Sequence, residues 1–399
     1  MERLGTYQKI HDFMGKEKQP YEFKRKYAQI RVEEFKTECE NRGLNYHVSV
    51  GGLDSIVLFL FINEICEIPV PGISASSLED SSIRLIHRAL GINNIPPLKK
   101  ADGSLWTKAE VIKEFGFPVI SKEVAAKIEL LQHPSEKNKT VRHAIITGET
   151  GEYGGFQTDS KMKLKERWLN LFGGYENENE GTNYQIPDFQ VSSKCCYYLK
   201  EKNCDDWAKQ HNSVPFLGLM ASEGGRRAKS LRMNGCNYFG KSTIRSAPFA
   251  IYNRQDILKL ALEIDAMWKN GLSEKYKQKG IAEGRFDESY VMPESIVPTI
   301  YGIIDKKPDG TLFTTKEQRT GCSMCGFGIH METRPHRFDR KYKENPKEWE
   351  YLMFHLCKDE NGNDFGWAKV LDYIGVGWDP TTIGDNIAGQ MDIFDFLNE

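Results

Sequence analysis

The sequence predicts an α/β protein with a mainly parallel sheet and helices on its faces. Apolar segments at 46–50 and 68–76 alternate with helical patterns at 54–66 and 82–92. This β-α-β-α order is typical of parallel strands that are joined by crossover helices. A later apolar segment, VPFLGLMAS at 214–222, predicts a further strand.

The segments around these elements are mostly helical in pattern. Residues 1–45 are heavily charged and predict an N-terminal helical extension. Residues 107–131 predict two helices separated by a glycine and a proline. The periodicity weakens at about 133–190, where scattered glycines and the sequence NENEGTN indicate an insertion or a small helical subregion.

The C-terminal half completes the same domain. Residues 251–268 predict a helix with Asn253 as its N-cap, and apolar periodicity returns in AKVLDYIGVGW near the end of the chain. We therefore expect one α/β domain at 46–378, after the extension at 1–45 and before a C-terminal tail at 379–399.

Composition and charge exclude several classes of protein. With 39% apolar and 28% charged residues, the 399-residue chain has the composition of a soluble globular protein. Its formal net charge of −2 gives no overall attraction to nucleic acid or acidic membranes, so such binding would need a local patch. No apolar run approaches the roughly 20 residues that span a bilayer, and MERLGTYQKIHDF lacks the apolar core of a secretory signal. We expect a cytoplasmic protein with no membrane partner.

A glycine-rich turn joins the first strand to the next helix in SVGGLDS at 49–55. Backbone N–H groups at such a turn, together with a helix N-terminus, form an anion site, and a serine hydroxyl can add a hydrogen bond. The motif is neither a Walker loop nor the Rossmann G-x-G-x-x-G. Taken alone, it fits a phosphate cradle and a tight turn equally well. In the tight turn, Gly51 and Gly52 reverse the chain, and Asp54 or Ser55 caps the helix.

Four of the nine cysteines are distinguished by their spacing. Cys195 and Cys196 are adjacent in SSKCCYYLK, and Cys322 and Cys325 form a C-x-x-C in RTGCSMCGFGIH. Four thiolates suit zinc or an iron–sulfur cluster, and an adjacent pair is awkward for a zinc knuckle, which favours the cluster. The alternative is a set of buried thiols without a metal.

Two basic segments are further candidates for binding. MASEGGRRAKSLR at 220–232 places Glu223, Arg226 and Arg227 directly after a predicted strand, where open α/β sheets bind their ligands. Arginine forks also match phosphate oxygens. The second segment, HMETRPHRFDRKYK at 330–343, follows the C-x-x-C. Each segment is alternatively a solvated charged face.

Together these motifs resemble the phosphoadenosine phosphosulfate (PAPS) reductase family, α/β proteins of the PP-loop ATP pyrophosphatase type. The likeness is greatest to the reductase-like proteins of bacteriophages and mobile elements. It covers most of residues 46–378 and implies a parallel-sheet, adenine-nucleotide alpha-hydrolase-like (PP-loop) fold. Seven motifs carry it, in this order: SVGGLDS (49–55), FGFPVISKEVA (115–125), SKCC (193–196), FLGLMASEGGRR (216–227), RSAPFAIYNRQDIL (245–258), RTGCSMCGFGIH (319–330) and KVLDYIGV (369–376).

The resemblance implies a site for ATP with Mg²⁺ or for a PAPS-like adenylyl nucleotide. The family's PP-loop, S-G-G-x-D-S, matches Gly51, Gly52, Asp54 and Ser55, and Val50 replaces the first serine. Asp54 is the residue that would position the metal ion.

A second nucleotide-binding segment of the family, A-S-E-S-x-x-R, matches Glu223 and Arg227, and Gly224 replaces its second serine. Arg227, with Arg226 beside it, would neutralise phosphate charge in the transition state. Asp54 and Arg227 are therefore the expected catalytic residues.

The family's cluster-bearing members bind [4Fe–4S] through a Cys-Cys pair and a C-x-x-C, which correspond here to Cys195, Cys196, Cys322 and Cys325. Authentic reductases carry a C-terminal Glu-Cys-Gly-Leu/Ile-His whose thiolate attacks the sulfate sulfur. This chain ends MDIFDFLNE, and Cys357 lies outside such a motif. The expected reaction is therefore adenylation-coupled sulfur transfer, with a sulfur donor or thioredoxin-like protein and a nucleic-acid substrate as candidate partners.

Two alternatives stay open. One is true PAPS reduction with a thiol from Cys357 or from a partner protein. The other is a catalytically degenerate module that binds nucleotides or nucleic acid through the basic segments at 226–245 and 330–343. The products distinguish the three hypotheses. Release of pyrophosphate supports sulfur transfer, release of sulfite supports PAPS reduction, and nucleotide binding with neither product supports the degenerate module.

Overall fold

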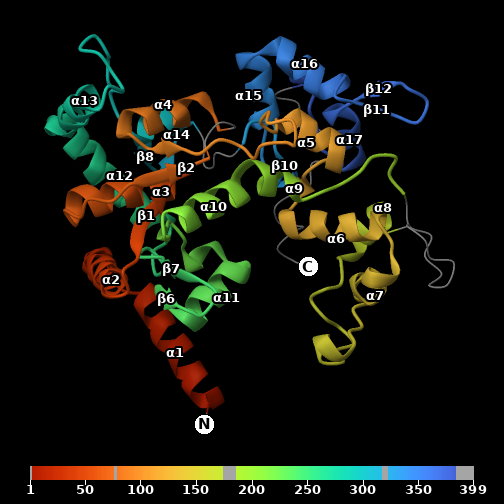
Figure 1. Ribbon diagram of the computed structural model, residues 1–399, viewed down its shortest axis with the longest axis horizontal. Helices are drawn as coiled ribbons and strands as arrows, with labels where there is room; N and C mark the ends of the chain where they lie inside the picture. The colour runs from red at the N-terminus through yellow and green to blue at the C-terminus, as the bar shows by residue number, and fades with distance from the viewer. Residues whose placement is uncertain (1, 76–78, 174–185, 317–321, 383–399) are drawn as a thin grey trace. The chain divides into compact units, whose positions relative to one another are not determined.

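The computed structural model describes residues 2–75, 79–173, 186–316 and 322–382, except for the side chains of residues 2–6 and 226 (Figure 1). The structure is mixed α/β with a mostly parallel central sheet, as predicted. The chain divides into two compact units. The first unit combines Met1–Pro96 with Lys202–Gly321, and the second unit combines Pro97–Glu201 with Cys322–Glu399.

The central sheet belongs to the first unit and has six strands in the order β3-β2-β1-β5-β7-β6. All neighbouring pairs are parallel except β6 and β7. The strands are β1 (Asn45–Ser49), β2 (Gly72–Ser74), β3 (Asn93–Asn94), β5 (Ser213–Leu217), β6 (Asn237–Phe239) and β7 (Ile244–Ser246).

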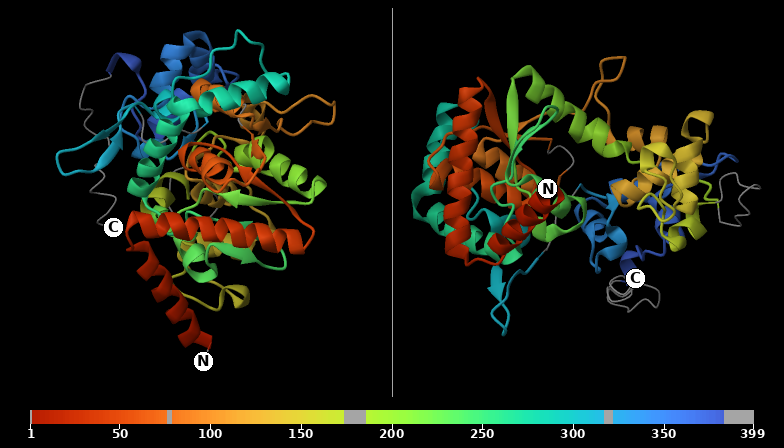
Figure 2. Two further views of the ribbon diagram at one scale, coloured as in Figure 1. Left: turned by 90° about the vertical axis from the view of Figure 1, so that its left-hand side faces the viewer. Right: turned by 90° about the horizontal axis from the view of Figure 1, so that it is seen from below.

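Helices surround this sheet, and the two N-terminal helices meet at an angle (Figure 2). A β8–β9 hairpin (Ile304–Lys306, Leu312–Thr314) projects from the same unit. The helices are α1 (Glu2–Glu17), α2 (Tyr21–Asn41), α3 (Leu53–Leu60), α4 (Ser81–Leu90), α10 (Lys202–Gln210), α11 (Gly225–Asn234), α12 (Arg254–Met267), α13 (Ser273–Ala282) and α14 (Val297–Tyr301).

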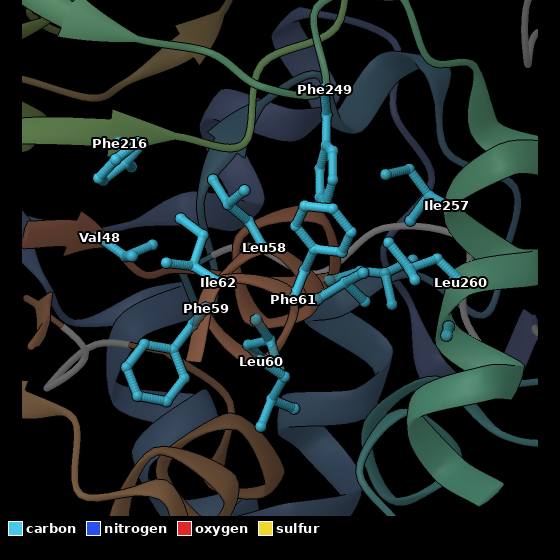
Figure 3. Close-up of a cluster of buried hydrophobic side chains, with 14 of the residues drawn as sticks. Val48, Leu58, Phe59, Leu60, Phe61, Ile62, Phe216, Phe249, Ile257 and Leu260 are labelled. Carbon is cyan, nitrogen blue, oxygen red and sulfur yellow. The ribbon is translucent and has the colours of Figure 1, made fainter. Parts of the chain in front are cut away.

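The core of the first unit explains why β1 is central. His47 and Val48 are consecutive and both buried, so both faces of the strand are covered, as is usual in parallel sheets. The strongly apolar α3 continues as a π-helix over Phe61–Ile65. Figure 3 shows Phe61 facing Phe249, with ring centroids 5.4 Å apart.

The second unit has its own apolar core and is mainly helical. Two short strand pairs accompany the helices: β4 (Val119–Ile120) with β10 (Gly326–Phe327), and β11 (Cys357–Lys358) with β12 (Asp364–Phe365). Its helices are α5 (Lys108–Phe115), α6 (Lys122–Gln132), α7 (Lys139–Thr147), α8 (Glu166–Phe172), α9 (Lys194–Cys196), α15 (Arg337–Glu344), α16 (Pro346–Phe354) and α17 (Trp367–Tyr373).

Most expected elements are present, with two differences. The Asn253 side chain caps α12 as predicted. The strand expected at 214–222 is shorter, because β5 ends at Leu217 and residues Ala221–Glu223 form a 3₁₀ turn. The two helices expected within 107–131 are α5 and α6, and the sequence pattern missed the short β4 between them.

The two units do not follow the predicted boundaries at 1–45, 46–378 and 379–399. The N-terminal helices belong to the first unit, together with the parallel sheet. The region 133–190 lies in the second unit and contains α7 and α8, and its residues 174–185 lie outside the described part of the chain. Most of the tail, residues 383–399, also lies outside that part.

Candidate functional site

The glycine-rich turn at residues 50–52 connects β1 directly to α3. Gly52 is the N-cap residue of α3, so neither Asp54 nor Ser55 caps the helix. Ser55 closes the turn instead. The Gly51 N–H donates to Ser55 Oγ at 2.8 Å, and this hydroxyl donates to the Gly52 carbonyl oxygen at 3.0 Å.

Two buried side chains from distant elements hold the turn in place. His87 of α4 donates from Nε2 to the Gly51 carbonyl oxygen at 2.8 Å. The Tyr301 hydroxyl of α14 accepts the Leu53 N–H at 2.8 Å. The conformation of the turn is therefore fixed by contacts far along the sequence, and not only by its glycines.

The end of β5 lies directly against the first turn of α3. A Cβ atom on Gly218 would lie 2.9 Å from the backbone carbonyl carbon of Asp54 and 2.9 Å from the Ser55 nitrogen. Any side chain at 218 would therefore push the two segments apart. Position 218 requires glycine because the backbone after β5 meets the backbone of α3 there.

A cleft of about 540 Å³ opens at the carboxyl ends of β1 and β5. From β1 the chain winds outward to β2 and β3, whereas β5 lies on the other side of β1. Such a reversal of strand order creates a crevice in which open α/β sheets bind their ligands. The lining residues are Ser49, Gly52, Leu53, Asp54, Ser55, Leu217, Gly218, Leu219, Met220, Ser222, Glu223, Arg227, Arg254 and Tyr301.

The charged side chains of the cleft form two pairs, each of one arginine and one carboxylate. Arg227 donates from Nη1 to both carboxylate oxygens of Glu223, at 2.9 and 3.0 Å. Arg254, in the first turn of α12, has its Nη1 3.7 Å from Asp54 Oδ1. The Arg226 backbone lies in the first turn of α11, but its side chain is outside the described part.

This arrangement suits a polyanion that brings its own divalent cation. Two arginines offer planar donors for phosphate or sulfate oxygens. Mg²⁺ commonly takes one or two carboxylates from a protein when phosphates complete its coordination, and the cleft offers two. Within each pair the arginine and the carboxylate balance one another's charge. An anionic ligand would take the place of the carboxylates beside the arginines, and the cation would take the place of the arginines beside the carboxylates.

The four cysteines singled out by spacing lie near one another in the second unit. The pKa values of Cys195 and Cys196 are raised to about 12, mainly by burial and to a smaller extent by the neighbouring Cys322 and Cys325. The C-x-x-C turn is closed by a hydrogen bond of 3.1 Å from Cys325 N–H to the Cys322 carbonyl oxygen. The electrostatic effects of Cys322 and Cys325 on Cys195 and Cys196 place the two cysteine motifs near one another.

The turn between these two cysteines is tightly constrained. Met324 is buried and has a positive φ of 51°, a conformation that costs energy outside glycine. Lys108 donates to the Ser323 carbonyl oxygen, and its charge lowers the pKa of Cys195 against the larger effect of burial. Among the described residues, no group of three or more His, Cys, Asp or Glu side chains is arranged to hold a metal ion.

Cys357, the alternative nucleophile, lies in β11 at a separate cavity of about 370 Å³. The other lining residues include Lys113 and His355, and His355 Nδ1 is 3.2 Å from Asp364 Oδ2. Burial raises the pKa of the Cys357 thiol to about 11, although Lys113 opposes this shift. A thiol with such a pKa is mostly protonated at neutral pH and is a weak nucleophile.

The basic segment at 330–343 has its charges largely engaged within the second unit. Arg334 donates to the buried Asp339 from Nε at 3.2 Å and from Nη2 at 2.6 Å. Arg337 pairs with Glu332, and Lys341 lies 2.6 Å from Glu348. These contacts favour a structural role for much of this segment over a surface for nucleic acid.

Nine of the fourteen residues that line the cleft were not predicted as site residues, and four of these nine bear on its chemistry or shape. Arg254 follows the Asn253 cap, which marks the start of a helix but does not by itself mark a ligand contact. Ser49 ends a central strand, and Gly218 follows another, which are weak signals of a ligand contact. Nothing in the local sequence marks Tyr301, because only the fold brings it to residue 53.

Within the described part of the chain, no helix combines the length and apolar character that a membrane crossing requires. Comparison of the chain with protein-family models, curated proteins and solved structures found no match.

Proposed function

We propose that this chain is a PP-loop-type enzyme of the PAPS reductase family that couples adenylyl transfer to sulfur transfer. It would bind ATP with Mg²⁺, or a PAPS-like adenylyl nucleotide, in the cleft between β1 and β5. The observation that carries the proposal is this cleft at the reversal of strand order. A glycine-rich turn, the start of α3 and two arginines converge there on a volume of about 540 Å³.

Each group of the cleft has a role in this chemistry. Gly52 and Ser55 line the cleft at the start of α3 and would contact phosphate oxygens there, where the helix dipole favours negative charge. Gly51, which the resemblance also assigned to the nucleotide, is not among the lining residues, and its N–H is donated to Ser55 Oγ. Arg227 and Arg254 would leave their carboxylate partners and neutralise the phosphate charge that grows in the transition state. Asp54 and Glu223 would hold Mg²⁺, which when bound balances charge on the leaving pyrophosphate. Arg254 joins the two catalytic residues expected from the sequence.

The reaction has two steps. A substrate oxygen attacks the α-phosphorus of ATP, and the bond from that phosphorus to the bridging oxygen breaks. Pyrophosphate leaves with the electron pair, and the substrate oxygen carries AMP. Sulfide then attacks the substrate carbon, the carbon–oxygen bond breaks, and AMP leaves with the electron pair, so that sulfur replaces the oxygen.

We also propose an iron–sulfur cluster in the second unit, on the chemistry of the donor set alone, because the four side chains are not arranged around a metal position in the described part of the chain. Four thiols within electrostatic reach of one another, two of them buried with strongly raised pKa values, gain from a cation that makes thiolates favourable. Cys195, Cys196, Cys322 and Cys325 would hold [4Fe–4S], which when bound transfers single electrons or cross-links the unit.

The test uses anaerobically purified full-length protein with ATP–Mg²⁺, and separately with PAPS plus reduced thioredoxin. We expect pyrophosphate release from ATP, reduced at least tenfold in Arg254→Met and unchanged in Arg84→Met, a substitution of an exposed arginine on α4. Sulfite release from PAPS would instead establish the reductase alternative. Nucleotide binding without either product would establish the degenerate binding module, and absence of binding would refute all three.

A further inference from the structure

A buried chain of side chains leads from the interior of the first unit to the cleft. Ser213 Oγ of β5 is 2.8 Å from His47 Nδ1 of β1. On the other side of the ring, His47 Nε2 is 3.4 Å from Ser49 Oγ. His47 is only 3% exposed, whereas Ser49 lines the cleft. A hydroxyl, an imidazole and a second hydroxyl are therefore in series, and the last one faces the ligand volume.

Strand geometry explains this alignment. Residues i and i+2 of a strand point to the same face, so His47 and Ser49 share one side of β1. Val50 follows on the opposite side and is 4% exposed, with its N–H donated to the Ile73 carbonyl oxygen at 2.7 Å. The hydroxyl that faces the cleft thus comes from position 49, one residue before the site at which the resemblance placed it.

The protonation state of His47 determines which groups donate and which accept along the hydrogen-bonded series Ser213–His47–Ser49. Burial, reinforced by the charge of His211, lowers the pKa of His47 to about 4, so the ring is neutral near pH 7. A neutral imidazole has one donor and one acceptor nitrogen. If Ser213 donates to Nδ1, then Nε2 carries the proton and donates to Ser49, and the Ser49 hydroxyl hydrogen is left to point into the cleft.

We propose that His47 and Ser213 are positioning residues that make Ser49 a hydroxyl donor to a phosphate oxygen of the bound nucleotide, in place of the serine that Val50 replaces. The inference rests on the proposed function, because it requires an anionic ligand in the cleft. An anion at Ser49 selects the Nε2–H tautomer of His47, and hydrogen bonds that point the same way along a chain strengthen one another.

Calorimetric titration of ATP–Mg²⁺ and of inorganic pyrophosphate tests the proposal. We expect Ser49→Ala to weaken binding about tenfold, since it removes one hydrogen bond to a charged group. His47→Leu weakens binding by a similar factor, and the double variant binds no more weakly than Ser49→Ala. His47→Gln, whose amide supplies one donor and one acceptor, restores part of the loss. His11→Gln, an exposed histidine of α1, is the matched control and binds like wild type.

A spectroscopic measurement separates positioning from a merely structural role. In ¹⁵N-histidine-labelled wild-type protein, ATP–Mg²⁺ should move the two His47 ring nitrogens to the shifts of the Nε2–H tautomer. This readout needs no variant, so it decides the matter even if His47→Leu fails to fold. Normal binding by Ser49→Ala, additive losses in the double variant, or a His47 spectrum that ignores the nucleotide would each overturn the proposal. If wild-type protein binds neither probe, the proposed function itself fails.

Discussion

The backbones at Gly218 and Asp54 are in direct contact: a Cβ atom on Gly218 would lie 2.9 Å from the Asp54 carbonyl carbon. This contact joins the end of β5 to the first turn of α3, and both segments line the cleft. Since backbone atoms cannot swing aside as side chains do, the contact fixes the width of the cleft at its base.

Gly218→Ala should therefore widen the base of the cleft. We expect a loss of about 1–3 kcal/mol in the free energy of unfolding, as is typical of overpacking, and ATP affinity reduced more than tenfold. Urea unfolding and calorimetry measure the two effects. Gly15→Ala is the control, because a Cβ on Gly15 in α1 would meet no atom within 4 Å. Equal behaviour of the two variants would show that the close approach is not needed.

Tyr301→Phe should destabilise the glycine-rich turn. The substitution removes the oxygen that accepts the buried Leu53 N–H, and an unsatisfied buried donor costs about 1–3 kcal/mol. Tyr252→Phe is the matched control, because the Tyr252 hydroxyl is buried and makes no hydrogen bond within the described structure. Thermal unfolding should separate the variants, and hydrogen exchange at Leu53 should accelerate only in Tyr301→Phe.

A buried ion pair ties α2 to the helix that carries Arg254. Lys24 Nζ lies 2.7 Å from Asp256 Oδ2, and the side chains are 3% and 7% exposed. Lys24→Met should cost about 3–5 kcal/mol in the free energy of unfolding, because it leaves a buried carboxylate without its cation. Adding Asp256→Asn should recover part of this loss, since an amide oxygen can still accept the Asn253 N–H. Lys36→Met, at the surface pair with Glu40, should have little effect.

The buried His47 predicts a pH dependence of stability. Its folded pKa of about 4 lies below the ordinary value of 6.5, so between these values the unfolded chain binds a proton that the folded chain does not. The free energy of unfolding should therefore fall by roughly 3 kcal/mol through this group as the pH drops from 6.5 to 4. His47→Leu should lose less stability than wild type over this range in urea unfolding. Parallel pH profiles for the two proteins would contradict the assignment.

The cysteine cluster predicts a metal content. Anaerobically purified protein should contain iron and inorganic sulfide in equal amounts and show the broad visible absorption of iron–sulfur thiolates. Both should disappear in the Cys195→Ser/Cys322→Ser variant and persist in Cys357→Ser, whose thiol lies at the separate cavity in the second unit. Chelation of the iron should lower the unfolding temperature. A colourless protein with one zinc per chain would refute the cluster.

Local sequence determined the elements and part of the site. The apolar pattern around SVGGLDS predicted β1, the turn and α3, because alternation and glycine act over a few residues. The cap of α12 was equally local. Cysteine spacing singled out two motifs, and the structure places them close enough for Cys322 and Cys325 to affect the pKa of Cys195, whereas the metal site itself stays a prediction. The short β4, β6 and β7 escaped prediction, because two or three residues are too few to show a period.

Only the tertiary structure decided which side chains face the cleft. Strand order brings β1 beside β5, more than 160 positions later, and so aligns Ser213, His47 and Ser49. Tyr301 reaches Leu53 across 248 positions, and Arg254 meets Asp54 across a similar distance in the chain. Such contacts join residues that are far apart in the sequence, and the residues around each partner do not show which distant residue it will meet. The sequence by itself therefore determined that a glycine-rich turn joins a buried strand to an apolar helix, whereas the packing of distant helices and strands decided which groups surround that turn.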